Sequence, residues 1–298
     1  MDKHLAVIDL GTNTFHLIIV KVSADQSFRQ VYRERILVSL AEECIDKICS
    51  SAFKRGIKAL NHFSQKLYTY KVNNYRAIGT AALRTASNGL EFIAAAKNAT
   101  GITIELVDGE QEAKLIYQGV QQAITIEAPV LIMDIGGGSV ELILADNKGI
   151  IAAQSFPIGI AVLFNNFIHS DPVTREEIEN IRAFIIHNTS LFFQKNHPCL
   201  PLKSLIGAAG TFEILNQILE CHYHSPVAIT TFHQLLKEII KTTHQQRLLS
   251  PNIPNSRAKM IVGALLLTDI ISQQAGIEKI LISPYALKEG AISQMIKK

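Results

Sequence analysis

The sequence reads AVIDLGTNTFHLI at residues 6–18 and LIMDIGGGSVELI at residues 131–143, which is 125 positions later. Each stretch is an apolar, β-branched run that ends in an Asp, then a glycine turn, then a second apolar run. Two such runs joined by a short glycine turn predict a β-hairpin. Because the pattern recurs with the Asp, the first Gly and the Leu-Ile pair at matching places, we expect an internal duplication.

The flanking sequence supports this duplication. Three strands followed by alternating helices and strands occur twice, which is typical of an α/β fold with a mixed sheet flanked by helices. We therefore predict two domains, residues 1–125 and 126–298, with a final helix at 286–298 that could pack back onto the first domain. A cleft between them is where a ligand would be expected. The predicted strands are 5–9, 15–22, 30–39, 75–79, 102–107, 129–135, 140–146, 150–158, 204–207 and 279–283, and the main predicted helices are 44–70, 89–101, 109–123, 160–167, 174–195, 232–244, 256–274 and 286–298.

The composition limits the class of protein. Of the 298 residues, 48% are hydrophobic and 18% charged, which fits a well-buried globular chain. The net charge of +3 comes without a basic run, so we expect no nucleic-acid partner. No apolar run reaches membrane-helix length and no leader pattern is visible, so we expect a cytoplasmic protein that does not contact the membrane. The cysteines form no C-x-x-C pair and fit reduced thiols; they are Cys44, Cys49, Cys199 and Cys221.

The two glycine turns favour phosphate binding. Glycine allows a positive φ and a close backbone approach, and consecutive N–H groups in such a turn can hold an anion. An Asp directly before each turn would repel phosphate unless a cation lies between them, which suggests Mg²⁺. Either turn alone is equally consistent with an ordinary tight hairpin. The candidate phosphate-binding residues of the turns are Gly11, Thr12, Asn13, Thr14, Gly136, Gly137, Gly138 and Ser139.

Other phosphate and nucleophile motifs do not fit. No G-x-x-x-x-G-K-[ST] is present, and Ser139 lacks the second glycine of a nucleophile elbow. The stretch GAAGT at residues 207–211 lies between a predicted strand and helix, so free helix N–H groups could face an anion there. Gly210 and Thr211 are the candidate contacts. An ordinary glycine-containing turn between a strand and a helix explains this stretch equally well.

Glu112 is a candidate general base. Asp108 and Gln111 form a variant capping box at the start of a helix, and Glu112 then shares one face with apolar residues three, four and seven positions later. A carboxylate on that inward face would be partly desolvated, which would raise its pKa towards the range of a general base. A helix-dipole role is the alternative.

Arg84 is a candidate phosphate clamp. It follows a predicted strand in GTAALR, at residues 79–84, and a guanidinium can hold a phosphate through two hydrogen bonds. A solvated surface arginine is the alternative.

Taken together, these stretches resemble the exopolyphosphatase and guanosine pentaphosphate phosphohydrolase (Ppx/GppA) family. The similar stretches, in the order of the family, are 9–16, 79–84, 109–113, 134–141 and 207–211, and they span nearly the whole chain. The resemblance implies two ribonuclease H-like domains of the actin-like ATPase type and a short, two-domain form.

The resemblance also implies roles. Glu112 is similar to the glutamate that activates the attacking water. Asp134 and Glu141 are similar to the carboxylates that hold Mg²⁺, with Mn²⁺ as the alternative metal. The turns and Arg84 would hold phosphate, the substrate would be inorganic polyphosphate or guanosine pentaphosphate, and a homodimer is plausible from the family. A phosphoryl transfer of this kind depends mainly on positioning and charge stabilisation.

Five positions depart from the family pattern. Gln111 replaces a first glutamate, Val140 replaces a Thr, Pro284 and Lys288 replace an Asp and an Arg, and Lys259 replaces an Asp that often follows Arg-Ala. The core set of Glu112, Asp134 and Glu141 is kept, so a phosphoric anhydride hydrolase is expected. The alternatives are an ATP-dependent kinase of the same superfamily and a non-catalytic phosphate or nucleotide sensor.

Overall fold

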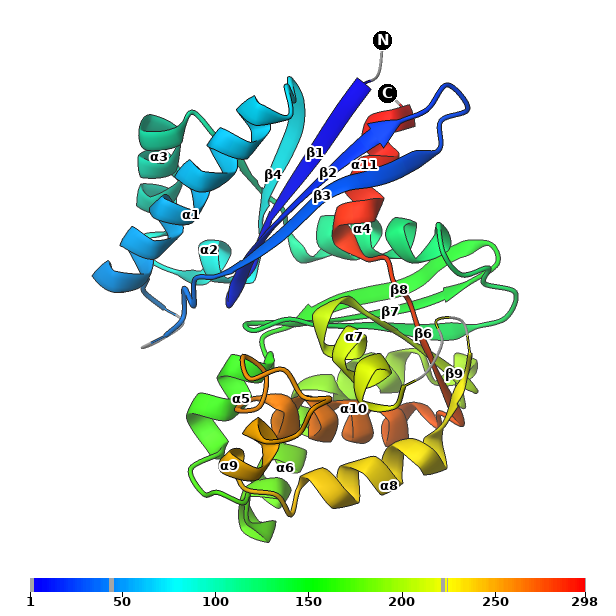
Figure 1. Ribbon diagram of the computed structural model, residues 1–298. Coiled ribbons are helices and arrows are strands. Elements are labelled where there is room, and N and C mark those ends of the chain that lie inside the picture. The colour runs from blue at the N-terminus through cyan, green and yellow to red at the C-terminus, as the bar shows by residue number, and fades with distance from the viewer. Residues whose placement is uncertain (1–2, 43–45, 221–222, 224, 298) are drawn as a thin grey trace. The chain divides into compact units, whose positions relative to one another are not determined.

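The computed structural model describes residues 3–42, 46–220, 223 and 225–297 (Figure 1). Cys44 and Cys221 lie outside the described residues. The chain divides into two compact units, Met1–Gly119 with Leu287–Lys298, and Val120–Ala286. Each unit is described by itself.

The first unit contains a mixed five-stranded sheet in the order β3-β2-β1-β4-β5. Strands β1, β2 and β3 are antiparallel neighbours, whereas β4 runs parallel to β1 and β5 parallel to β4. Figure 1 shows α1 and α3 on one side of this sheet and α11 on the other. The elements are β1 (Lys3–Leu10), β2 (Thr14–Val22), β3 (Phe28–Leu37), α1 (Ser50–Thr69), β4 (Asn74–Gly79), α2 (Ala81–Thr85), α3 (Gly89–Thr100), β5 (Ile104–Leu106), α4 (Gly109–Gln121) and α11 (Leu287–Lys297).

The second unit contains a six-stranded sheet in the order β10-β11-β9-β6-β7-β8. Strands β6, β7 and β8 are antiparallel, and β9 and β11 continue the sheet in parallel. Helix α10 packs against α5, α6 and α8. The elements are β6 (Val130–Ile135), β7 (Val140–Asp146), β8 (Gly149–Phe156), α5 (Ile160–Phe167), α6 (Arg175–Lys195), η1 (His197–Cys199), β9 (Ser204–Ala208), α7 (Ala209–Ile218), β10 (Val227–Ala228), α8 (Ile229–Ile239), α9 (His244–Leu248), α10 (Ile261–Ala275) and β11 (Lys279–Ile282).

The two sheets have the same topology. If the short edge strand β10 is set aside, β8-β7-β6-β9-β11 matches β3-β2-β1-β4-β5 in order and in strand direction. The predicted fold class is therefore confirmed: an α/β protein with two duplicated units, each a mixed sheet flanked by helices. Each unit has its own apolar core, built on buried strand residues such as Ile8 and Leu17 in the first unit and Met133 and Leu142 in the second.

Most predicted elements are present, and the differences have local causes. The predicted strands 30–39 and 150–158 end earlier, at Leu37 and Phe156, because the next residues leave the sheet to bond the glycine turns. The predicted helix 232–244 corresponds to α8, which ends earlier, at Ile239, and the separate helix α9 begins at His244. The Thr243 side chain accepts from the Gln246 N–H, and the Gln246 side chain bonds back to the Thr243 N–H, so a new helix starts there.

Other differences concern short elements and helix starts. Four elements were not predicted, α2, η1, β10 and α9, because they are too short to show a periodic pattern. Helix α10 begins at Ile261, five residues after the predicted start. In the part of the chain that the structure describes, no helix is both long enough and apolar enough to cross a membrane.

Candidate active site

The first glycine turn joins β1 to β2, with Asp9 opposite His16 and Leu10 opposite Phe15. The Gly11 N–H donates to the Thr14 carbonyl oxygen at 3.2 Å. A Cβ at Gly11 would lie 3.1 Å from that oxygen, so close backbone approach selects glycine here. The positive φ that the sequence analysis allowed does not occur at Gly11.

The second glycine turn joins β6 to β7 with the same geometry. Asp134 lies opposite Glu141, the Gly136 N–H donates to the Ser139 carbonyl oxygen at 2.9 Å, and a Cβ at Gly136 would lie 3.1 Å from that oxygen. The hydroxyl residue of each turn bonds the side chain two positions on. The Ser139 hydroxyl donates to Glu141 Oε1 at 2.7 Å, and Thr14 Oγ1 is 2.8 Å from His16 Nε2.

The carbonyl oxygens of the second turn are held by the start of α5. The N–H groups of Gly159, Ile160 and Ala161 donate to the oxygens of residues 138, 136 and 137, at 3.3, 3.0 and 2.9 Å. In a trans peptide the N–H points opposite to the C=O of the same unit. The N–H groups of residues 137–139 therefore point away from α5. A turn whose N–H groups all face one side is suited to anion binding.

The first turn is held in the same way by the segment after β3. The Leu40 N–H donates to the Thr12 oxygen at 2.7 Å, and the Val38 and Ser39 N–H groups donate to the Asn13 oxygen, both at 2.9 Å. The N–H groups of Asn13 and Thr14 therefore face away from residues 38–40. Sequence reasoning missed both holding segments. The only local signal was that each follows the third strand of its unit.

Glu112 lies in the first turns of α4. The capping box that was predicted is present, because the Gln111 N–H donates to Asp108 Oδ1 at 2.8 Å and the Asp108 N–H donates to Gln111 Oε1 at 3.3 Å. Glu112 is 6% exposed, whereas Glu110 is exposed and pairs with Lys114 at 2.7 Å. The predicted inward and outward faces of this helix are thus confirmed.

Arg84 and Glu112 are in contact. Arg84 Nη1 donates to the Val107 carbonyl oxygen at 2.7 Å and to Glu112 Oε2 at 3.3 Å. Both bonds use the same nitrogen, and within the described residues Nε and Nη2 make no hydrogen bond. The Arg84 side chain is 30% exposed. It is therefore fixed at one end and keeps donors for a bidentate partner such as phosphate.

Asp134 and Glu141 lie directly opposite each other on β6 and β7 and are both nearly buried. Side chains at directly opposed positions share one face of a sheet. The Glu141 carboxylate also accepts from the Ser155 hydroxyl at 2.7 Å, a contact from β8 that sequence reasoning missed. Among the described residues, no group of three or more His, Cys, Asp and Glu side chains could hold a metal. A pair of carboxylates fits Mg²⁺, which prefers one or two carboxylates completed by water and phosphate oxygens.

The GAAGT stretch has a packing role in part. A Cβ at Gly207 would lie 2.0 Å from Cδ1 of Phe212, so this glycine makes room for a buried ring. The Thr211 hydroxyl is buried and donates to the Ile135 carbonyl oxygen at 3.4 Å. Gly210 and Thr211 form the first turn of α7, and their role in phosphate binding stays a prediction.

Two residues that depart from the family pattern, Val140 and Lys288, are buried in the structure. Val140 is fully buried in the apolar core of the second unit, next to Glu141 in a strand and therefore on the opposite face. Lys288 is buried in α11. Burial raises the pKa of the Asp9 carboxyl, and the positive charge of Lys288 opposes that shift. Lys288 thus keeps a positive charge near the Asp that precedes the first turn.

The predicted site residues therefore form two groups. In the first unit, the first turn is ordered and Arg84 contacts Glu112; in the second, the glycine turn lies beside Asp134 and Glu141. The cleft and the roles of these residues stay predictions.

Comparison with known proteins gives a consistent result. The sequence profile of the Ppx/GppA phosphatase family matches residues 18–298. A guanosine-5'-triphosphate,3'-diphosphate pyrophosphatase of Aeromonas hydrophila is 28% identical over 294 residues, which cover 96% of this chain and 58% of that protein. A Haemophilus influenzae protein, named provisionally as an exopolyphosphatase, is 26% identical over 302 residues, covering 99% of this chain and 92% of its own.

Among solved structures, an exopolyphosphatase from Cytophaga hutchinsonii superposes with a TM-score of 0.93 at 31% identity, covering 99% of this chain and 98% of the other. The chain spans less than two thirds of the length of the first curated relatives. The family profile nevertheless covers almost all of it, including the second glycine turn, both carboxylates of β6 and β7, and Glu112. The chain belongs to the Ppx/GppA phosphatase family.

Proposed function

We propose that the protein is an exopolyphosphatase that hydrolyses the terminal phosphate of inorganic polyphosphate with Mg²⁺. The observation that carries the proposal is the buried Glu112 carboxylate, 3.3 Å from a guanidinium that keeps other donors available. This contact supports the proposal because it brings the candidate general base and the candidate phosphate-binding cation together in one unit. Membership of a phosphatase family supports the same chemistry.

In the proposed reaction, Glu112 accepts a proton from water as the water oxygen attacks the terminal phosphorus. The bridging P–O bond breaks, the electron pair leaves on the shortened chain, and orthophosphate is released. Arg84 would bind the non-bridging oxygens through Nε and Nη2. The N–H groups of the two glycine turns would bind the phosphates and neutralise charge that develops on oxygen.

The carboxylates of the second unit would hold the metal. Asp134 and Glu141 are the ligands, and the Ser139 and Ser155 hydroxyls orient Glu141 by donating to one of its oxygens. When bound, Mg²⁺ would offset the negative charge of the phosphate chain. With a cation bound there, the Asp before the anion-binding turn would no longer repel the phosphate.

Guanosine pentaphosphate is the second candidate substrate. It is favoured by the name of the Aeromonas hydrophila relative, whereas polyphosphate is favoured by the name of the Cytophaga hutchinsonii structure, which matches this chain nearly end to end. Both substrates use the same attack on a phosphoric anhydride. A non-catalytic phosphate or nucleotide sensor is the third candidate, and the departures at Val140, Pro284 and Lys288 motivate it.

The test is release of orthophosphate from polyphosphate, guanosine pentaphosphate and ATP in the presence of Mg²⁺. We expect the wild type to release phosphate and Glu112→Gln to lose a factor of about 100 or more in kcat, because loss of a general base typically costs that much. Glu110→Gln is the matched control. It lies two residues away on the exposed face and should keep full activity.

Three results would contradict the proposal in different ways. No release by the wild type from any substrate would favour the sensor. Preferential release from guanosine pentaphosphate would replace the polymer as substrate. Equal kcat for Glu112→Gln and the wild type would remove the role given to Glu112.

A further inference from the structure

A second candidate site lies in the second unit, and none of its lining residues belongs to the candidate active site. It is a cavity of about 240 Å³ between the end of α5, the loop that follows it, α9 and the start of α10. Its volume lies just below the range of typical ligand pockets, so it would suit a small ligand. Ten residues line it: Phe164, Ile168, His169, Ser170, Asp171, Val173, His244, Arg247, Lys259 and Val262.

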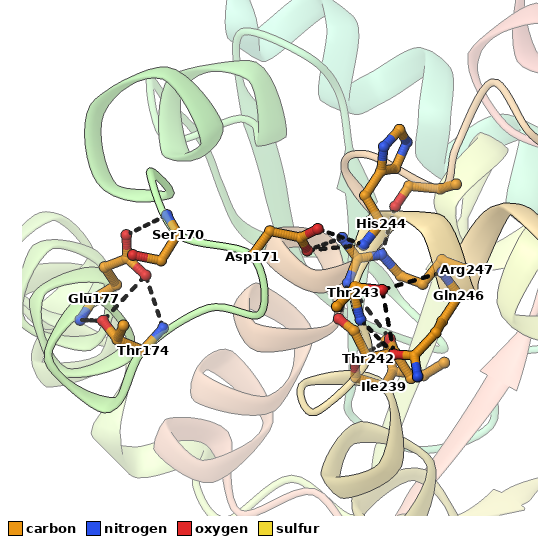
Figure 2. Close-up of polar contacts among 11 residues, drawn as sticks. Ser170, Asp171, Thr174, Glu177, Ile239, Thr242, Thr243, His244, Gln246 and Arg247 are labelled. Atoms are coloured by element: carbon orange, nitrogen blue, oxygen red, sulfur yellow. Dashed lines mark hydrogen bonds and ion pairs between the residues drawn. The ribbon is translucent and has the colours of Figure 1, made fainter.

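One side of the loop is fixed by Glu177 of α6 (Figure 2). The Glu177 carboxylate accepts from the N–H groups of His169 and Ser170, both at 2.8 Å, and from the Thr174 N–H at 2.7 Å. This carboxylate is therefore occupied by the backbone of the loop. It does not line the cavity.

The other side of the loop is tied to α9 by Asp171 (Figure 2). Both Asp171 carboxylate oxygens lie 2.8 Å from the His244 N–H, and Oδ1 lies 3.3 Å from Arg247 Nη2. Arg247 is 6% exposed and also donates to the carbonyl oxygens of Ala258 and Thr242. Among the described residues, Asp171 is the only acidic one that lines the cavity, and its charge is matched by Arg247.

Three further basic side chains line the cavity without an acidic partner. Within the described residues, the side chains of Lys259, His169 and His244 form no ion pair. The Lys259 ammonium instead lies over the Phe164 ring, 4.6 Å from its centroid. Basic groups of one sign around a cavity with low-dielectric walls concentrate positive potential.

The remaining wall is apolar. It consists of the side chains of Phe164, Ile168, Val173 and Val262. An inorganic phosphate ion would make no contact with these apolar side chains. An occupant with an anionic group and an apolar body would satisfy both parts of the lining.

We propose that this cavity binds a small organic anion, in which a phosphate or carboxylate group faces Lys259 and the two histidines while an apolar body contacts Phe164 and Val262. Lys259 is the specificity-determining residue, because within the described lining it is the one lysine or arginine side chain that has no acidic partner. The site belongs to the second unit alone. The proposal does not depend on the reaction assigned to Glu112.

The test is methyl NMR of the full chain labelled at isoleucine and valine, titrated with phenyl phosphate and, separately, with benzoate. The methyl signals of Ile168, Val173 and Val262 report on this cavity and not on phosphate bound elsewhere. We expect saturable shifts of these signals with at least one of the two anions, and the tighter of the two identifies the preferred acidic group. Lys259→Met should weaken that binding about fivefold or more, since it removes one charge near the anion.

Two variants serve as controls. Lys148→Met removes an exposed lysine from the β7–β8 turn of the same unit and should leave the affinity unchanged. Lys259→Arg keeps the positive charge and should retain binding. Equal affinities for wild type and Lys259→Met would overturn the proposal, as would the absence of saturable shifts with both anions. So would equally tight binding of benzyl alcohol, which lacks the charge, or of inorganic phosphate, which lacks the apolar body.

Discussion

At the scale of single residues, Oε1 of Glu141 accepts hydrogen bonds from two hydroxyl groups that come from different segments of the chain. Ser139 belongs to the glycine turn, but Ser155 comes from β8, and both lie 2.7 Å from Oε1. In the proposed site, both hydroxyl groups would hold the Glu141 carboxylate in place as it binds Mg²⁺. Donors behind a metal ligand fix its orientation and raise metal affinity.

We therefore expect Ser155→Ala to raise the Mg²⁺ concentration needed for half-maximal phosphate release by about tenfold, with a loss of about 1 kcal/mol in the free energy of unfolding. Activity titrated against Mg²⁺, with urea unfolding in parallel, measures both. Ser190→Ala in α6 is the control, since the Ser190 hydroxyl makes only a 3.4 Å bond within the helix. An unchanged Mg²⁺ requirement in Ser155→Ala would argue against Glu141 as a ligand.

At the scale of elements, α6 begins with a capping box in which Thr174 and Glu177 bond each other's backbone N–H groups. Burial alone would raise the pKa of Glu177. Hydrogen bonds from the backbone of Thr174, His169 and Ser170 and from the Thr174 hydroxyl outweigh it and hold the pKa at about 2. The carboxylate therefore stabilises the folded state in its charged form.

The sign of the pH dependence follows from that lowered pKa. The contribution of Glu177 is complete above its ordinary pKa of 4.5 and is lost as the pH falls towards about 2. We expect Glu177→Gln to lower the free energy of unfolding by about 1 kcal/mol at pH 7, and the difference from wild type to shrink between pH 4.5 and 2. Urea unfolding across this pH range measures it. Glu179→Gln, exposed on the same helix, should show little difference at any pH.

The sequence-based predictions were most accurate at the scale of secondary-structure elements. The strand pair around each glycine turn, the capping box at Asp108 and the buried face of α4 all follow from local spacing. Local spacing failed where a long-range contact ends an element, as at Leu37 and Phe156, because the partners of the next residues lie in a turn more than twenty positions away.

At the scale of the whole molecule, the chain completes the second unit and then returns α11 to the first. Helix α11 meets α4 at Gly290, where a Cβ would lie 1.8 Å from the Leu115 carbonyl oxygen and 3.0 Å from the Gly119 nitrogen. Gln294 adds a hydrogen bond to Gln118 at 2.8 Å. Leu115 and Gly119 share the face of α4 that carries Glu112, so the C-terminal helix packs close to that face.

We expect Gly290→Ala to push α11 away from α4 and to lower the free energy of unfolding by about 1–3 kcal/mol, the usual cost of overpacking. Urea denaturation measures this loss, and kcat should fall as well if α11 positions Glu112. Gly263→Ala in α10 is the matched control. Its added methyl would meet only Ile168 Cδ1 at 3.4 Å, so its stability should be unchanged or slightly higher. Wild-type stability in Gly290→Ala would show that the two helices separate without cost.

The sequence by itself determined the repeated hairpins, the duplicated α/β plan, the helix start before Glu112 and the position of Asp134 before the second glycine turn. These depend on residue type and short-range periodicity, which the chain displays directly. Glu141 became a candidate only through the family resemblance. The tertiary structure alone decided which segments hold the turn carbonyls, that Ser155 supports Glu141, and that α11 packs on α4 through Gly290. Each of these is a contact between segments distant in sequence, and no local pattern encodes which distant backbone will come within hydrogen-bonding distance.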